Sequence, residues 1–347
     1  MFLLLEGITH HTEAELVRLM KDLVRAQLVV EESPDVFAFR HALTRQAVEA
    51  DLLARERRAL HLQIVEALER LAAERIDQRV AELASHAYTA EDWQRVLIYA
   101  DRAGQQALQL YALQTAIEHF SHALEAAQRL DLRAPTKLYR SRGQAYALLS
   151  SFAAAKADFE QTVTRAREDG DQALEWQSLL DLGFLWMARD FVQAGHYFNQ
   201  ALALARARSD PNQLAYSLNR LGNWHVNADQ PLRGRPYHEE ALALFEHTGD
   251  ARGQAETLDL LAGASYLAGD LHGATAFYAQ AAARFRALDD RVGLASSLSW
   301  LALCGPAALN TMTAAASLVV CIQMAEEALQ LARGMSWRSG EAFALIV

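Results

Sequence analysis

The hydrophobic and polar positions of this chain follow a helical period over most of its length. Around Phe198, for example, Ala194, Phe198 and Ala201 are spaced by four and three residues, which places them on one face of a helix. Short polar turns such as NADQP at 227–231 and LAGD at 267–270 separate the helical stretches. Ala and Leu dominate, while the chain has 17 Gly and 6 Pro. Ala and Leu favour helices, and Gly and Pro, which disfavour them, are scarce, so the pattern predicts an all-α protein.

A pattern of small and aromatic residues recurs five times, at spacings of 39, 40, 39 and 40 residues. In each copy a small residue is followed by a second small residue, then by an aromatic residue or histidine, then by a further small residue. The first column is Gly104, Gly143, Gly183, Gly222 and Ala262; the second is Ala116, Ala155, Ala194, Gly234 and Ala274; the third is Phe120, Phe159, Phe198, His238 and Tyr278; the fourth is Ala123, Thr162, Ala201, Ala241 and Ala281. Such a period is typical of repeat architectures.

Each copy reads as a pair of helices that cannot bury its own apolar face, so neighbouring pairs must stack into a solenoid. The four columns resemble the tetratricopeptide repeat, in the 40-residue variety of bacterial signalling regulators. That resemblance implies helical hairpins in a right-handed superhelix. The expected units are 95–133, 134–173, 174–213, 214–253, 254–293 and 294–334, with the start of another at 340–347. The sixth unit aligns only with seven inserted residues.

The first eighty residues show a different order of elements. Thr12 and Glu15 form a capping box that starts a helix. Leu28–Val30 and Val36–Phe39 read as two strands of a hairpin whose turn is Glu31–Asp35. A long helix is expected from Ala42.

Helix, hairpin and helix are the layout of a winged helix. The segment resembles the winged-helix joint of bacterial signal-transduction ATPases with numerous domains, as in large LuxR-type and cyclase-linked regulators. The stretches FRHALTR at 39–45, RRALH at 57–61 and 81–108 carry the resemblance. It implies a joint and connecting helix at 1–80 and repeats at 81–347, and the usual first helix of the winged domain is expected to be missing before Phe2.

Charges within 37–61 are mixed, which is typical of a solvated face. An apolar stripe with partial helical period is expected to lie beneath them, formed by Leu43, Ala47, Ala50 and Leu53 and continued by Leu60, Ile64 and Leu68. The net charge of −10 disfavours general nucleic-acid binding, which needs a basic surface.

Signatures of catalysis or cofactor binding are missing from the sequence. It contains no G-x-x-x-x-G-K-[ST], no G-x-S-x-G and no H-E-x-x-H. His41 and His61 have no third ligand at metal spacing, so we expect both to be structural. His119 and His122 could share one helix face, but no carboxylate or cysteine at matching spacing completes a metal site, so a structural role is favoured over a metal there. We therefore expect neither an enzyme nor a bound cofactor or metal.

Two further features concern the compartment of the protein. Cys304 and Cys321 give no disulfide framework and read as buried thiols, which fits a reducing cytoplasm. Residues 292–325 carry no charge; a Gly-Pro break at 305–306 and several polar residues favour two buried helices over a membrane span. We expect a cytoplasmic protein without a membrane contact.

The resemblance to tetratricopeptide stacks implies that the first helix of each unit lines a concave binding surface. Asn219 and Asn223 are four residues apart and could bind a peptide backbone; a pair of solvated amides is the alternative. The implied ligand-contacting residues are Lys137, Arg140, Gln144, Tyr216, Asn219, Arg220, Asn223, Glu256, Asp259 and Tyr266.

The sequence therefore predicts a non-enzymatic protein-interaction and ligand-sensing module, the regulatory part of a signal-transduction ATPase or transcriptional regulator. Its partners would be a protein, a peptide or a small inducer, with an ATPase module in the same chain or in another. The apolar end FALIV predicts either that the chain is cut within a repeat or that a partner covers this end, which includes self-association through the uncapped last repeat. The alternative is a winged-helix DNA-binding regulator that uses its repeats to oligomerise.

Overall fold

The computed structural model describes residues 2–9, 11–33, 36–71, 76–304 and 317–347. These residues form helices and one two-stranded sheet. The chain divides into two compact units, which we call unit 1 (Met1–Arg165) and unit 2 (Ala166–Val347). The division falls inside one helix, Phe152–Asp169. The sequence-based boundary near residue 80 lies within unit 1 and stays a prediction.

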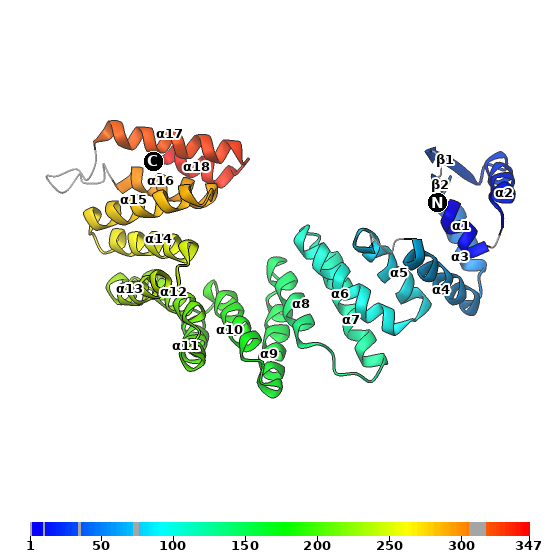
Figure 1. The fold of residues 1–347 in the computed structure, drawn as a ribbon, viewed down its shortest axis with the longest axis horizontal. Coiled ribbons are helices and arrows are strands. Elements are labelled where there is room, and N and C mark those ends of the chain that lie inside the picture. Colours follow the sequence, from blue (N-terminus) through cyan, green and yellow to red (C-terminus); the bar gives the residue numbers. More distant parts are fainter. Residues whose placement is uncertain (1, 10, 34–35, 72–75, 305–316) are drawn as a thin grey trace. The chain divides into compact units, whose positions relative to one another are not determined.

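Unit 1 opens with the expected order of helix, hairpin and helix (Figure 1). Its elements are α1 (Phe2–Thr9), α2 (Glu13–Arg25), β1 (Val29–Ser33), β2 (Val36–Phe39), α3 (Ala42–Asp51) and α4 (Ala54–Leu71). The backbone N–H and the hydroxyl of Thr12 both donate to the Glu15 carboxylate at 2.9 Å, which starts α2 as predicted. The antiparallel strands pair Val29 with Phe39. Residues 34 and 35 of the expected turn lie outside the described residues.

Three details of this segment differ from the sequence-based expectation. The long helix from Ala42 is divided, because Leu52 adopts an extended backbone and Glu56 accepts the N–H of Leu53 at 2.8 Å to cap α4. The expected stripe is not buried in α3: Leu43 is 77% exposed, and the side chain of Leu53, just after α3, is 70% exposed. A short helix, α1, precedes α2 and contacts α4.

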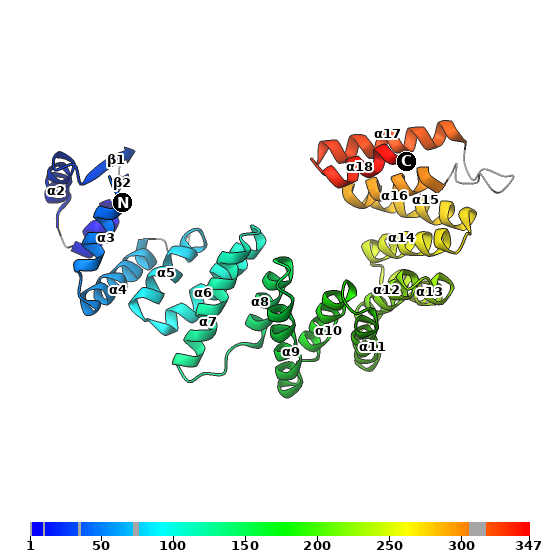
Figure 2. The same cartoon turned by 180° about the vertical axis from the view of Figure 1, so that it is seen from behind.

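The remainder of the chain is a series of helical hairpins, visible from both sides in Figures 1 and 2. Unit 1 continues with η1 (Ile76–Arg79), α5 (Val80–Ala90), α6 (Trp93–Gln109), α7 (Leu113–Arg129), α8 (Thr136–Leu148) and α9 (Phe152–Asp169). Unit 2 contains α10 (Gln172–Met187), α11 (Phe191–Arg208), α12 (Pro211–Asn227), α13 (Pro231–Thr248), α14 (Ala251–Leu267), α15 (Leu271–Ala287), α16 (Arg291–Cys304), α17 (Leu318–Gly334) and α18 (Arg338–Ile346).

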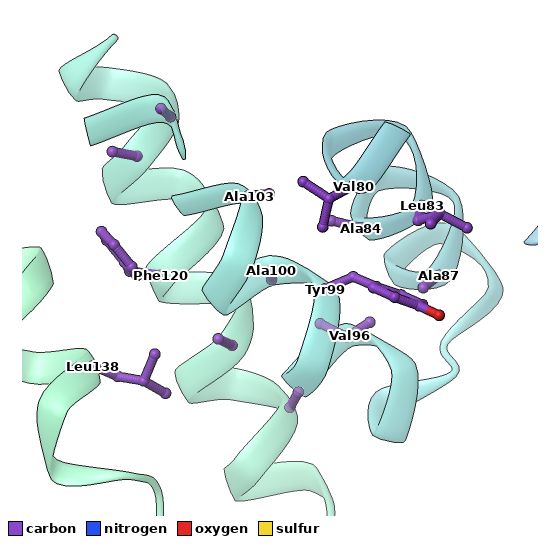
Figure 3. Close-up of a cluster of buried hydrophobic side chains, with 14 of the residues drawn as sticks. Val80, Leu83, Ala84, Ala87, Val96, Tyr99, Ala100, Ala103, Phe120 and Leu138 are labelled. Atoms are coloured by element: carbon purple, nitrogen blue, oxygen red, sulfur yellow. The ribbon is translucent and has the colours of Figure 1, made fainter. Parts of the chain in front are cut away.

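The two helices of each hairpin meet where the first and third columns of the repeat face one another. A Cβ at Gly183 would lie 2.3 Å from the Phe198 ring, and one at Gly104 would lie 2.6 Å from the Phe120 ring. Glycine is therefore required for the rings to reach the backbone of the first helix. In unit 1 these contacts extend into a core that joins α5, α6, α7 and α8 (Figure 3). The fold is all-α and has the helical hairpins of a tetratricopeptide-like solenoid.

The last hairpin, α16 and α17, is less regular than the others. The expected break at Gly305-Pro306 lies outside the described residues. Helix α16 is largely buried, as predicted, but the first turns of α17 are not, since Leu318 and Val319 are each 65% exposed. Ile346 at the end of α18 is 80% exposed. None of the described helices is long and apolar enough to cross a membrane. Self-association through this end stays a prediction.

Candidate partner-binding face

The ten predicted ligand-contacting residues fall into two groups. Lys137, Arg140 and Gln144 lie on α8 in unit 1, whereas the other seven lie on α12 and α14 in unit 2. Lys137 forms an ion pair with Asp101, with Nζ and Oδ2 2.7 Å apart. Of the seven residues in unit 2, Tyr216, Arg220, Asn223 and Glu256 lie near one another, whereas Asn219, Asp259 and Tyr266 make other contacts.

In unit 2 the consecutive first helices α12, α14 and α16 contact one another. Tyr216, Arg220 and Asn223 are spaced by four and three residues along α12, so they share one side of that helix. Phe184 of α10 and Glu256 of α14 flank this stripe. We call these five residues the first-helix face.

Arg220 is the central charge of the first-helix face. Its guanidinium carbon lies 4.9 Å from the centroid of the Phe184 ring, and that phenylalanine is 49% exposed. In the described part of the chain, no carboxylate lies within ion-pair distance of Arg220. Burial lowers the pKa of the guanidinium, and the more distant Glu256 opposes this effect. Arg220 is thus a half-buried cation whose hydrogen-bond donors are not used by any described residue.

The neighbours of Arg220 are held in place by other contacts. Arg252 Nε lies 3.1 Å from Glu256 Oε1, so this carboxylate is engaged on its own helix. The Tyr216 ring packs edge-on against Phe245 with centroids 5.0 Å apart. Burial, with a smaller contribution from Asp250, raises the pKa of Tyr216. The phenol therefore stays a neutral hydroxyl beside the guanidinium.

Asn219 does not share this side of α12. It is 4% exposed, and its Nδ2 donates to Thr257 Oγ1 at 2.7 Å. Its Oδ1 lies 3.0 Å from His238 Nδ1. The amide is therefore occupied between helices and is neither a solvated group nor one that this conformation offers to a ligand. Asn223 is half-buried and stays a candidate contact.

Hydrogen bonds between adjacent first helices were not anticipated from the sequence. Trp176 Nε1 donates to Ser217 Oγ at 2.7 Å, Asn219 donates to Thr257, and Ser297 Oγ donates to Asp259 Oδ1 at 2.6 Å. The buried hydroxyls occupy one repeat column: Ser178, Ser217, Thr257 and Ser297. That column, five residues before the small column, was a readable signal. The three hydrogen bonds link each first helix to the next one.

Asp259 and Tyr266 lie on α14 toward α16. Burial raises the pKa of Asp259 to about 6, although the bond from Ser297 lowers it. The Tyr266 ring lies edge-on to Trp300, with centroids 5.6 Å apart. Both residues serve the contact between α14 and α16 more directly than a ligand.

His238 occupies the aromatic column and is fully buried. Because Asn219 uses its Nδ2 to donate to Thr257, its Oδ1 accepts from His238 Nδ1–H. Nε2 is then unprotonated, and it has no hydrogen-bond partner among the described residues. Burial lowers the pKa of His238 to about 4. The side chain is a neutral core residue under the first-helix face.

The other described histidines, like the two cysteines, do not gather into a group of three possible metal ligands. His61 and His86 approach with their Nδ1 atoms 2.9 Å apart, and burial lowers the pKa of both. Burial likewise lowers the pKa of His119 and His122, and His122 stacks on Tyr88. Within the described ranges, no three metal-ligating side chains gather at one place. Both cysteines are buried free thiols: Cys304 and Cys321.

Comparisons with known proteins identify the fold. No protein-family profile matches the chain, and no curated protein sequence matches it. A signal transduction ATPase with numerous domains and a tetratricopeptide repeat sensor, PH0952 from Pyrococcus horikoshii, is 15% identical with a TM-score of 0.56; the match covers 98% of this chain and 55% of PH0952. This chain thus spans about half the length of that protein.

Two other solved structures match most of both chains. Aspartyl phosphate phosphatase F from Bacillus subtilis is 15% identical with a TM-score of 0.58, over 99% of this chain and 89% of that one. A Rap protein complexed with Competence and Sporulation Factor is 13% identical with a TM-score of 0.51, over 96% and 95%. At these identities the likeness concerns the helical-repeat fold.

Proposed function

We propose that the chain is a non-catalytic sensing module whose first-helix face binds an acidic segment of a protein or peptide partner. The observation that carries this proposal is Arg220, a half-buried cation that lies on an exposed aromatic ring and lacks an acidic partner in the described structure. A carboxylate bound there would meet guanidinium donors that are already oriented, which is favourable because charge-assisted pairs gain from fixed geometry.

The neighbouring residues suit the same ligand. Tyr216 offers a neutral hydroxyl and Asn223 an amide, so both can bond to a peptide backbone beside the carboxylate. Phe184 offers an apolar surface for the partner's adjacent side chain. The Rap protein solved with Competence and Sporulation Factor and the tetratricopeptide repeat sensor of PH0952 support ligand binding as one use of this fold.

A peptide selection on the full chain tests this function. Peptides displayed at random and selected for binding should be enriched in Asp and Glu. The substitution R220E should abolish their binding, because it turns the attraction into repulsion. The control R206E reverses the charge of an arginine on α11 whose side chain is 55% exposed. Its contact with Glu240 is long, with Nη2 and Oε2 3.9 Å apart, and the variant should bind the peptides as wild type does. Equal binding by R220E and wild type would show that the face is not the site.

We further propose that residues 1–80 form a winged-helix joint to an ATPase module, in the same chain or in another, and that the whole acts in signal transduction. The order α2, β1, β2 and α3 supports this assignment. Any relay would require the partner to bind two states of the protein with different affinities.

The alternative, in which the winged helix binds DNA, predicts an affinity that falls steeply with salt concentration. Fluorescence anisotropy with duplex DNA at 50 and 200 mM salt separates the two functions. The module proposed here would show no specific DNA binding at either concentration.

A further inference from the structure

A polar cavity of about 650 Å³ lies in unit 1, between the end of α7, the connection 130–135, α8 and α9. All of its lining residues belong to unit 1. Its volume is within the range of small-molecule sites, which is roughly 300–1,000 Å³. It is distant in sequence from the first-helix face and takes no part in the function proposed above.

The cavity exists because α8 lacks a first turn. The first helices α6, α10, α12 and α14 begin eleven residues before their small-column residue, whereas α8 begins at Thr136, only seven before Gly143. Pro135 explains the difference, because it has no N–H for the helix ladder and disfavours helical backbone at Ala134. The missing turn is replaced by an irregular connection, which leaves space beside α7 and α9.

Asp131 is displaced by the same change. In the other pairs the residue at its repeat position is an aspartate that caps the first helix; Asp92, Asp171, Asp210 and Asp250 each accept a backbone N–H there. Asp131 instead adopts a left-handed backbone with φ 53° at the end of α7. Its carboxylate lines the cavity and has neither a capping bond nor an ion pair among the described residues.

Arg165 of α9 is the second unused charge. Its Nη1 lies 3.4 Å from the Ala134 carbonyl oxygen, and its guanidinium lies over the Tyr139 ring, 4.8 Å from the centroid. Its Nε–H is buried without an acceptor in the described structure, and no carboxylate pairs with it there. Nη1 and one face of the guanidinium are thus in contact with the protein, and the buried Nε–H would reach a bidentate acceptor only after a shift of the side chain.

Other charges of the cavity are already neutralised. Arg142 donates to Asp158 with both contacts at 2.8 Å. Glu125 accepts from Tyr88 at 2.8 Å and pairs with Arg129 at 3.1 Å. Among the described residues, Arg165 and Asp131 form no ion pair, either with each other or with another side chain.

We propose that this cavity binds a small zwitterion of the amino-acid class, whose carboxylate meets Arg165 and whose ammonium group meets Asp131. A ligand with both charges satisfies both groups, whereas a simple anion would leave Asp131 to repel it. The buried Nε–H of Arg165 gains an acceptor on binding, after a side-chain adjustment of the kind that is common at binding sites. Leu124 and Leu132 line the same cavity and leave room for a short side chain.

Isothermal titration of the full chain with L-alanine tests the proposal, with acetate and methylammonium as probes that carry only one of its charges. L-Alanine should bind at least tenfold more tightly than either. R165Q and D131N should each weaken L-alanine binding about tenfold or more. D131N keeps the backbone, because asparagine tolerates the left-handed conformation. The control R102Q removes an exposed arginine that pairs with Asp77 elsewhere in unit 1, and should bind like wild type.

Three results would overturn the proposal: no binding of L-alanine at millimolar concentration, acetate binding as tight as L-alanine, or unchanged binding by a folded D131N variant. Circular dichroism of each variant establishes folding. Unchanged peptide binding at the first-helix face in R165Q and D131N would separate this site from the proposed function.

Discussion

Replacing His238 by phenylalanine tests whether a neutral histidine is buried in unit 2. Its pKa of about 4 in the folded chain lies below the ordinary value of 6.5, so the unfolded chain binds the proton more tightly. Stability is therefore full above pH 6.5 and is lost as pH falls toward 4. At about 1.36 kcal/mol per pKa unit, His238 lowers the free energy of unfolding by about 2 kcal/mol at pH 5.

The variant H238F has no titrating group at this position and restores the aromatic residue of the repeat column. It leaves Asn219 Oδ1 without its donor, which costs about 1–3 kcal/mol at every pH. The informative quantity is therefore the change in the free energy of unfolding between pH 7.5 and pH 5. Contributions of other groups to this change, including Asp259, are common to both proteins and cancel.

Urea unfolding of the full chain, followed by circular dichroism at both pH values, measures this change. Wild type should lose about 2 kcal/mol more than H238F between pH 7.5 and pH 5. The control H272F replaces an exposed histidine on α15 and should keep the wild-type dependence. Equal pH dependence in wild type and H238F would refute the assignment of a neutral, buried His238.

Four further outcomes follow from the packing of unit 2. G183A should cost about 1–3 kcal/mol in a thermal melt, because its Cβ would meet the Phe198 ring at 2.3 Å. Burial raises the pKa of Asp259 from 3.8 to about 6, so stability is lost as pH rises through that window. In urea unfolding, the free energy of unfolding of D259N should exceed that of wild type by about 2–3 kcal/mol at pH 8 and match it near pH 3.5. N219A should destabilise by about 1–3 kcal/mol, by calorimetry, because it leaves two buried groups unpaired. R252Q frees the nearest carboxylate on α14 to compete for the first-helix face, so selected acidic peptides should bind several-fold more weakly in anisotropy titrations.

The repeat was readable from the sequence because the contact that defines each hairpin is local. Gly183 and Phe198 are fifteen residues apart, and the close approach of ring and backbone leaves a glycine in four of the five copies. The break between α3 and α4 was not readable in the same way. Leu52 and Leu53 carry no turn signal, and the helical period continues through them; the bond from Leu53 N–H to Glu56 decides the break.

The candidate site was only partly predictable, because exposure in a stack depends on the next hairpin. Asn219 and Arg220 are adjacent in sequence, yet the first is buried and the second is half-buried. The difference is set by Thr257, 38 residues away, which accepts the Asn219 amide. The cavity of unit 1 was missed for a related reason: Pro135 was visible, but the space it opens depends on α7 and α9.

The spacing of the first helices explains why Arg220 remains unpaired although Glu256 lies on the next helix. The bond from Asn219 to Thr257 holds α12 and α14 at a fixed separation, and Arg252 holds the Glu256 carboxylate on its own helix. If α12 and α14 moved closer together, Glu256 could pair with Arg220, and a carboxylate of the partner would then have to compete with Glu256 for that arginine. Because a preorganised, unsatisfied donor costs stability in the free protein and returns it on binding, the buried hydrogen bonds beneath the first-helix face maintain the affinity of the residues above it.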